Sequence, residues 1–466
     1  MIDFKKLKIP NAIVTLFGII VIMTVMTWVI PGGNFERIQN PETGVTVVDA
    51  SSFHIADEKT PVGLFKMFLC IQRGFVDSGS IIFLIFFAYF CVYSVTKTGS
   101  LHAAINVMLK RLRGRETMVI VIFMLIFALA GSTYGEWDTV YGLIPIFVGI
   151  AIAMGYDAMV GLAMTGMAVG IGFASATTNP FTIGIAQAIA ELPIFSGLLF
   201  RAAVFAAFVG VGIWWTLRYA KRVKEHPEES LVYGEDMGLL EIDRSSLEKY
   251  EFTPKRQFTI FWLFATIIFI VFSTLKLGWY LDEMSAIFLC SGVLISIFWK
   301  MPPDEITENL IFTCRDIMIG ALIVGFSRAI MVVLTEGNIL DTIIYGMYQP
   351  LQHMPKWLAA EGMLVFQNIM NLFIPSGSGQ ATAVMPIMIP LADLVGLNRQ
   401  IAILAYQFGD GYSNLFWPVG GIMVMAAIAH VPIGKWYRFF VPLFGIMLVM
   451  QAAFIALAVA IDYGPF

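Results

Sequence analysis

Two apolar segments of this sequence are interrupted by small and polar residues in matching order. The segment 401–429 contains Phe408-Gly-Asp-Gly-Tyr-Ser-Asn414, and the segment 158–190 contains Phe173-Ala-Ser-Ala-Thr-Thr-Asn179. Both motifs begin with phenylalanine and end with asparagine. Within hydrocarbon, unpaired backbone groups and charges are tolerated only where protein or a water-filled cavity surrounds them. We therefore interpret both segments as membrane helices that are broken around a site.

The composition indicates a membrane protein. Of the 466 residues, 58% are hydrophobic and only 13% are charged, and a soluble domain of that kind would expose too much apolar surface to water. We predict an all-α polytopic protein of the inner cell membrane, which contacts lipid but no nucleic acid. The cysteines have neither metal-ligand nor CxxC spacing, so we interpret them as ordinary packing residues. They are Cys70, Cys91, Cys290 and Cys314. We expect no cofactor.

Charged residues in the loops predict the orientation of the chain. Three lysines precede the apolar segment 11–30, and the positive-inside rule then places the N-terminus in the cytoplasm. The acidic stretch 32–60 follows on the external side. The charged stretch 218–256 is expected to be a cytoplasmic linker, and the C-terminus is expected to be external.

Each broken segment is preceded by two apolar arms with a polar turn between them. The first pair of arms, 117–154, turns at Gly131-Ser-Thr-Tyr-Gly-Glu136, and the second, 356–396, turns at Pro375-Ser-Gly-Ser-Gly-Gln380. The arm 117–130 has about 14 residues, fewer than the roughly 20 that a spanning helix needs. We expect both pairs to be re-entrant hairpins that turn near the middle of the membrane.

The order of hairpin and broken helix occurs once in each half of the chain, and the predicted topology gives the halves opposite orientations. Inverted repeats whose hairpin tips and broken helices meet at the midplane are typical of secondary transporters. Glycine lets the backbone turn and approach closely, hydroxyl and amide groups can bind a ligand, and helix ends favour ions. The predicted substrate-binding or ion-binding residues are Ser132, Thr133, Gly135, Glu136, Thr177, Thr178, Asn179, Pro180, Ser376, Gly377, Ser378, Gly379, Gln380, Asp410, Ser413 and Asn414. Candidate ligands of a coupling Na⁺ are Ser132, Asn179, Ser376 and Asn414, and H⁺ is the alternative coupling ion.

These motifs resemble those of the C4-dicarboxylate anaerobic carrier family of the ion transporter superfamily, and in particular its YfcC-like branch of basic amino acid antiporters. The resemblance rests on the second hairpin tip with Pro386, on Phe408-Gly-Asp-Gly411, and on Asn179-Pro-Phe-Thr-Ile-Gly184 with Gln187. It implies a scaffold domain and a transport domain that moves like an elevator, with the tips and breaks binding substrate and coupling cation. By analogy, it also implies a homodimer. The implied division is scaffold helices at 1–116 and 257–355, transport-domain halves at 117–217 and 356–466, and the linker 218–256.

The charges at the tips and breaks indicate the class of substrate. Aligning the halves places Glu136 opposite Gln380 and Asp410 opposite Ser175, while neither tip nor either break contains Lys or Arg. A dicarboxylate facing two carboxylates would need bound cations, whereas a cationic amino acid would not. The sequence therefore favours a secondary carrier for a basic amino acid, working as an exchanger or with a coupling cation. A Na⁺-coupled or H⁺-coupled C4-dicarboxylate carrier is the alternative.

Two other classes of protein are weighed against a carrier. A channel would need no alternating access. An intramembrane aspartyl protease would need Asp157 and Asp410 to face each other inside the bilayer. Because Asp157 lies at a predicted cytoplasmic turn, a helix cap is the preferred interpretation of this residue. We therefore expect a transporter and not an enzyme.

Three further features leave their roles open. Asp138 follows the first tip and could lie near the site. Arg328 lies inside a predicted span, where an unpaired cation is costly, so it requires either a carboxylate partner or a cavity. Asn368 and Asn371 share one face of a hairpin arm, and they could join two helices or line a cavity.

Overall fold

The computed structural model describes residues 12–39, 46–48, 52–111, 114–240 and 249–464. The N-terminal lysines used to predict the orientation lie outside these residues. Eight of the described helices are long and apolar enough to cross a membrane. The chain is therefore a multi-pass helical membrane protein, as its composition predicts.

The first half of the chain contains both long helices and several short ones. Its helices are α1 (Ala12–Val29), α2 (Leu64–Asp77), α3 (Gly79–Lys97), α4 (Ser100–Arg111), α5 (Glu116–Tyr134), α6 (Val140–Ala153), α7 (Ala158–Leu162), the π-helical turn η2 (Ala163–Met167), α8 (Ala168–Ala174), the π-helical turn η3 (Pro180–Gly184), α9 (Ile185–Ile189) and α10 (Leu198–Glu225). The linker after α10 carries two short 3₁₀ turns, η4 (Pro227–Glu229) and η5 (Gly238–Leu240).

The second half has a similar composition of elements. Its helices are α11 (Pro254–Leu277), α12 (Leu281–Phe298), α13 (Pro303–Asp316), α14 (Met318–Glu336), α15 (Leu340–Tyr348), the 3₁₀ turn η7 (Gln349–His353), α16 (Lys356–Phe373), α17 (Gly377–Leu394), α18 (Arg399–Ser413), α19 (Gly421–Ile428) and α20 (Ile433–Ala460).

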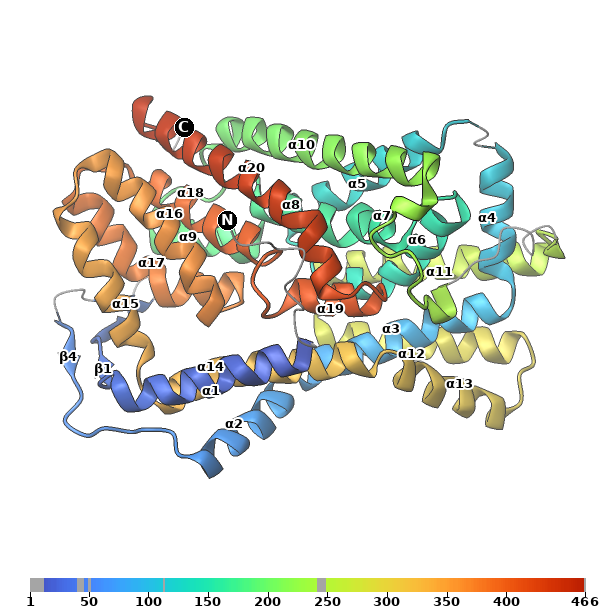
Figure 1. Ribbon diagram of the computed structural model, residues 1–466, viewed down its shortest axis with the longest axis horizontal. Coiled ribbons are helices and arrows are strands. Elements are labelled where there is room, and N and C mark those ends of the chain that lie inside the picture. Colours follow the sequence, from blue (N-terminus) through green and yellow to red (C-terminus); the bar gives the residue numbers. More distant parts are fainter. Residues whose placement is uncertain (1–11, 40–45, 49–51, 112–113, 241–248, 465–466) are drawn as a thin grey trace.

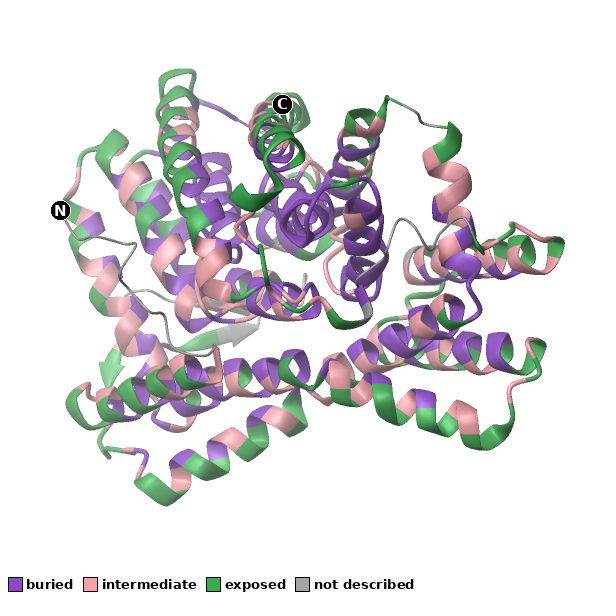
Figure 2. Cartoon of the chain, turned by 45° about the vertical axis from the view of Figure 1, so that its right-hand side comes forward, coloured by how far each residue is buried: buried purple, intermediate pink, exposed green. Residues whose placement is uncertain are grey.

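The helices form two layers. In Figure 1, α1, α2, α3, α12, α13 and α14 lie along the lower edge, and the hairpin arms, the interrupted helices, α10 and α20 lie above them. Buried residues gather in the middle of the upper layer (Figure 2), where every residue of α18 after Arg399 is buried. The most enclosed part of the chain is therefore the part that carries the interrupted helices.

The segment between α1 and α2 contains strands that the sequence does not predict. β1 (Gly33–Asn34) pairs with β4 (His54–Ile55), and β2 (Arg37–Gln39) pairs with β3 (Thr46–Val48), both antiparallel. The guanidinium of Arg37 donates to both carboxylate oxygens of Asp341, at 2.8 and 2.6 Å. The ring of Phe53 stacks on Tyr345 with 4.0 Å between centroids. These contacts fasten the segment to α15.

The first hairpin arm is longer than expected. α5 continues through Gly131, Ser132 and Thr133 and ends where Gly135 takes a φ of +76°. With 19 residues it is long enough to cross a membrane. The argument that this arm is too short to span was wrong, because the small and polar residues of the tip continue the helix instead of ending it.

The two interrupted helices break at different places relative to their motifs. The first helical run ends at Ala174 and resumes at Pro180, so its break falls at 175–179, inside the motif. The second continues through the whole of Phe408–Ser413 and breaks afterwards, at 414–420. The prediction that Gly409 and Gly411 interrupt this helix was wrong.

Close packing explains those two glycines. A Cβ at Gly411 would lie 2.2 Å from the Cα of Ala174, and one at Gly409 would lie 2.3 Å from the Cβ of Gln367. The glycines therefore let α18 approach α8 and α16 closely. The break itself is made by the following residues, which include Pro418 and a Gly420 with a φ of +74°.

Gly411→Ala should lower the stability of the folded protein. The added methyl would press on the backbone of α8, and overpacking of this kind costs about 1–3 kcal/mol. The measurement is thermal unfolding of the purified protein in detergent. Gly445→Ala in α20 is the matched control, because nothing lies within 4 Å of its added Cβ. Equal melting temperatures for the two variants would show that the contact between α8 and α18 can relax.

The predicted orientation can be checked with two cysteines. Glu58 follows β4 and Glu228 lies in η4 of the linker, and both side chains are exposed. In a background without native cysteines, Glu58→Cys should react with an impermeant maleimide added outside intact cells. Glu228→Cys should react only after the cells are opened, because the linker is expected to be cytoplasmic. Labelling of both positions from the same side would contradict the predicted topology.

Candidate functional site

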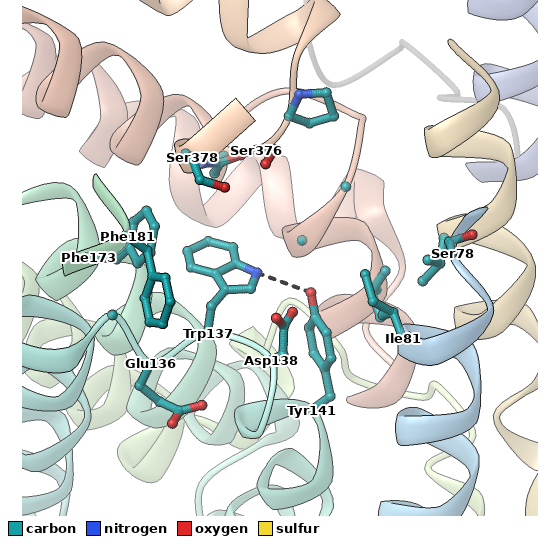
Figure 3. Close-up of a pocket in the computed structure, with 18 of the residues that line it drawn as sticks. Ser78, Ile81, Glu136, Trp137, Asp138, Tyr141, Phe173, Phe181, Ser376 and Ser378 are labelled. Atoms are coloured by element: carbon teal, nitrogen blue, oxygen red, sulfur yellow. Dashed lines mark hydrogen bonds between the residues drawn. The ribbon is translucent and has the colours of Figure 1, made fainter. Parts of the chain in front are cut away.

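A cavity of about 300 Å³ lies where the two layers meet. Its walls come from the tips of both hairpins, the second break, and the helices α3, α12 and α14 (Figure 3). The predicted site residues that line it are Gly135, Glu136, Ser376, Gly377, Ser378 and Asn414. The predicted site residues that do not line it are Ser132, Thr133, Thr177, Thr178, Asn179, Pro180, Gly379, Gln380, Asp410 and Ser413.

An aromatic wall of the cavity was missed by the sequence analysis. The indole N–H of Trp137 donates to the hydroxyl of Tyr141 at 3.1 Å, and the Trp137 ring meets the ring of Phe173 edge to face at 5.3 Å. Trp137 and Tyr141 follow the first tip at a spacing of four residues, so they share one side of the turn that opens α6 (Figure 3). That spacing is the signal that could have identified them.

The two carboxylates next to the first tip point in different directions. Oε1 of Glu136 accepts from the backbone N–H of Thr139 at 3.0 Å and also from the Thr139 hydroxyl. Figure 3 shows this carboxylate turned away from Ser376 and Ser378, while the carboxylate of Asp138 lies between Trp137 and Tyr141 and points toward them. Glu136 therefore closes the turn before α6, and although both residues line the cavity, the carboxylate that points toward its aromatic wall is that of Asp138.

The cavity also has a cation, which comes from outside the tips and breaks. Arg328 of α14 lines the cavity and lies 3.9 Å from the carboxylate of Asp77 in α2, with 49% and 44% of the two side chains exposed. Asp77 is therefore the carboxylate partner of Arg328, which the sequence alone did not identify. The charged residues of the lining are thus Glu136, Asp138 and Arg328, and the site presents both signs of charge to a ligand.

The first tip is bonded to the first break along several residues. The carbonyl of Ser132 accepts from the backbone N–H groups of Thr177 and Thr178 at 3.0 and 3.1 Å. The Ser132 and Thr177 hydroxyls lie 3.0 Å apart, and the Thr178 hydroxyl donates to the carbonyl of Thr133 at 3.1 Å. Asn179 caps the resumed helix by accepting from the N–H of Phe181 at 2.9 Å. The tip and the break therefore form one hydrogen-bonded unit behind the cavity wall.

The second break lies beside a buried carboxylate. Asp410 is fully buried in the last turn of α18, and its Oδ1 accepts from the amide of Asn371 at 2.9 Å. The same amide donates to Oδ1 of Asn414 at 3.2 Å. Within the described chain, Oδ2 of Asp410 has no hydrogen-bond partner, and a Cβ at Gly377 would lie 3.1 Å from it. Asn371 thus joins α16 to α18, and Asp410 lies directly behind the second tip.

The remaining predicted residues near the second tip have structural contacts. The Ser376 hydroxyl caps α17 by accepting from the N–H of Gly379 at 3.3 Å. The amide of Gln380 donates to the Gln367 side chain at 2.7 Å, and the Ser413 hydroxyl donates to the carbonyl of Gly409 at 2.5 Å. Of these three bonds, the one from Gln380 holds the second tip against α16, and the other two are local to the tip and to α18.

Asp157 is a helix cap, as expected. It accepts from the N–H of Val160 at 2.9 Å, from the hydroxyl of Tyr219 at 2.6 Å and from the hydroxyl of Ser230 at 2.6 Å. The carboxylate thereby fastens the linker to α7 and α10, and burial raises its pKa despite these donors. Asp157 therefore has a structural role and not that of a catalytic aspartate in a protease.

Comparison with known proteins gives a consistent result. The family model described as DcuC, the C4-dicarboxylate anaerobic carrier, matches residues 9–460. The chain is 27% identical to "Putative basic amino acid antiporter YfcC" of Escherichia coli (strain K12), and the alignment covers 98% of each chain. It is 26% identical to an uncharacterized protein of Haemophilus influenzae, again over 98% of each chain.

Two solved structures of transporters also align with the chain along its length. The YdaH transporter of Alcanivorax borkumensis is 15% identical, with a TM-score of 0.42, and the alignment covers 98% of this chain and 100% of that one. MtrF of Neisseria gonorrhoeae, from a class described as antimetabolite efflux pumps, is 16% identical with a TM-score of 0.44, and the alignment covers 97% and 96%.

Proposed function

We propose that this chain, which belongs to the C4-dicarboxylate anaerobic carrier (DcuC) family as its motifs indicate, is a secondary carrier of a basic amino acid such as arginine or ornithine. Membership of a transporter family points to transport and not to catalysis. The observation that carries the proposal is the pair of opposite charges in the cavity. Asp138 faces the cavity from the first tip, and Arg328 faces it from α14.

The charge balance of the cavity supports a basic amino acid. Arg328 offers a bidentate partner for an α-carboxylate, and Asp138 offers one for an ammonium or guanidinium group. The ring of Trp137 adds a face on which such a cation can lie. A volume of about 300 Å³ is at the low end for small-molecule sites, which favours a small metabolite.

A C4-dicarboxylate is the second candidate, and Arg328 is the observation that favours it. Arg328 could bind one carboxylate, but the other would face Asp138. A bound cation would then have to compensate the repulsion. The two candidates thus differ in whether Asp138 attracts the substrate or opposes it.

The two layers support an elevator mechanism. In the proposed movement, the layer with α1, α2, α3, α12, α13 and α14 is the scaffold, and the hairpins with the interrupted helices move against it as inverted repeats. The cavity lies between these layers, so a sliding movement would expose it to one side and then the other. Asp410, behind the second tip, is the proposed binding group for the coupling Na⁺ or H⁺.

Ligand-dependent stability and counterflow test the proposal. Arginine, ornithine and lysine should raise the melting temperature of the purified protein, because a ligand that binds the folded state stabilises it. Succinate and fumarate serve as comparison ligands, each with Na⁺ or K⁺. Liposomes that contain the protein and unlabelled arginine should then accumulate labelled arginine transiently. Stabilisation by dicarboxylates alone would reject the basic amino acid, and saturable uptake without counterflow would favour a channel.

A further inference from the structure

We infer that the first interrupted helix holds no exchangeable cation, because the guanidinium of Arg201 is a permanent cation at that break. The exchangeable cation or proton of the chain then binds at Asp410, beside the second break, and nowhere at the first. This inference rests on the proposed cation coupling, and it names the residue at which the coupling ion binds. It changes the expectation that Ser132 and Asn179 bind Na⁺.

Arg201 is a buried cation beside the first break. It lies in the first turn of α10 with only 2% of its surface exposed. Its Nε donates to the carbonyl of Thr177 at 3.2 Å, and its Nη1 donates to the hydroxyl of Tyr463 at 3.4 Å. Within the described ranges its Nη2 has no hydrogen-bond partner, and the two bonds of its other nitrogens go to no carboxylate. The acceptors of this guanidinium are therefore neutral oxygens.

The position of Arg201 suits the end of another helix. The helical run 158–174 ends just before Thr177, and the unsatisfied carbonyls at a helix C-terminus carry partial negative charge. This negative end of the run 158–174 stabilises a nearby cation. The positive N-terminal end of α10, in whose first turn Arg201 lies, does not. In carriers with interrupted helices, carbonyls of this kind coordinate coupling ions. Arg201 fills that role with a group that is always protonated.

The buried side-chain atoms at the first break also offer few ligands for a cation. Oδ1 of Asn179 is fixed by the N–H of Phe181, which leaves its Nδ2, a donor, without a partner within the described chain. The oxygens of Ser132 already accept or share hydrogen bonds with Thr177 and Thr178. A Na⁺ ion needs several oxygen ligands, and within the described chain residues 175–184 leave one buried side-chain oxygen without a partner, the hydroxyl of Thr182.

The second break lies beside a negatively charged group, whereas the first lies beside the cation of Arg201. Asp410 lies in the last turn of α18, where its carboxylate adds to the negative end of the helix and where the turn contains no basic residue. Oδ2 of Asp410 and Oδ1 of Asn371 are both buried and have no partner in the part of the chain that the structure describes. A buried carboxylate without a positive partner must take up a proton or bind a cation. The two breaks are thus electrostatic opposites.

Equilibrium binding of ²²Na⁺ and ⁸⁶Rb⁺ tests the inference without substrate. The proteins are the full chain in detergent as wild type, Asp410→Asn and Arg201→Met, with Arg201→Lys as the charge-conserving control. We expect at most one ion per wild-type chain and none on Asp410→Asn. A wild type that binds neither ion still agrees, because Asp410 then takes a proton. Two ions on the wild type, or any saturable ion remaining on Asp410→Asn, would overturn the inference.

Thermal unfolding gives the second readout. In N-methylglucamine buffer, Arg201→Met should melt at a lower temperature than Arg201→Lys, and added Na⁺ should raise its melting temperature more than that of the wild type. A melting temperature equal to that of the wild type without Na⁺ would also overturn the inference. If Arg201→Met does not fold, the number of ions bound by Asp410→Asn still tests the inference. If the ions bind as expected but the protein does not exchange substrate, only the proposed function is rejected.

Discussion

Asp410→Asn should abolish cation-driven uptake while the protein still folds and reaches the membrane. The amide has nearly the shape of the carboxylate and can keep the bond network with Asn371 and Asn414, but it cannot hold a cation or a titrating proton. With the cation bound, Asp410 is one partner of a buried charge pair, and losing such a partner costs about 3–5 kcal/mol, which corresponds to a fall of at least about 100-fold in cation affinity. Uptake into liposomes under an imposed Na⁺ or H⁺ gradient measures this directly.

A second buried carboxylate is the control for Asp410. Asp157→Asn removes a charge at the linker side of α7, where the carboxylate caps a helix and binds the hydroxyls of Tyr219 and Ser230. We expect this variant to lose stability but to keep its dependence on the ion gradient. If Asp410→Asn transports at the wild-type rate with unchanged ion dependence, Asp410 is not the coupling group. The second break would then require another explanation for its unpaired oxygens.

Long apolar segments could be predicted from the sequence, because their signal is local. The membrane spans and the existence of both interrupted helices follow from which residues hydrocarbon tolerates. The position of the second break did not follow, since a glycine in a helix can either end it or let a neighbour approach. At Gly411 the glycine lets a neighbour approach, because the backbone of α8, far away in the sequence, packs against it.

The orientation of side chains at the site could be predicted less well. Glu136 and Asp138 are two residues apart on a turn, and their side chains leave it in different directions (Figure 3). Which of them faces the cavity depends on Thr139, which binds Glu136, and nothing in the spacing indicates this. Arg328 was recognised as a costly cation, but its partner Asp77 lies on a helix that only the fold brings near.

Partners from distant segments also decide the role of Arg201. Its acceptors are the carbonyl of Thr177 and the hydroxyl of Tyr463, which belong to the first break and to the end of the described chain. In the sequence, Arg201 is one basic residue near the end of an apolar segment and resembles an interface anchor. Only the hydrogen bond across the fold shows that it neutralises a helix end beside the site.

Asp138→Asn should weaken the binding of a basic amino acid strongly. Asp138 faces the cavity, and among the described residues its carboxylate accepts one long hydrogen bond, from the Tyr280 hydroxyl at 3.4 Å, so it is available to a ligand. A hydrogen bond to a charged group contributes about 1.5–3 kcal/mol. We therefore expect affinity for arginine or ornithine to fall about 10-fold to 100-fold, measured as the ligand concentration that gives half of the thermal stabilisation.

Glu136→Gln is the matched control, and the comparison separates the two substrate classes. Because Glu136 binds the backbone N–H of Thr139 like a helix cap, this variant should lose about 0.5–2 kcal/mol of stability and keep its affinity for the substrate. For a dicarboxylate the sign at Asp138 reverses: removing the carboxylate relieves repulsion, so Asp138→Asn would bind succinate more tightly and need less Na⁺. Unchanged affinity for every ligand in Asp138→Asn, with weaker binding in Glu136→Gln, would show that Glu136 turns into the cavity when the substrate enters.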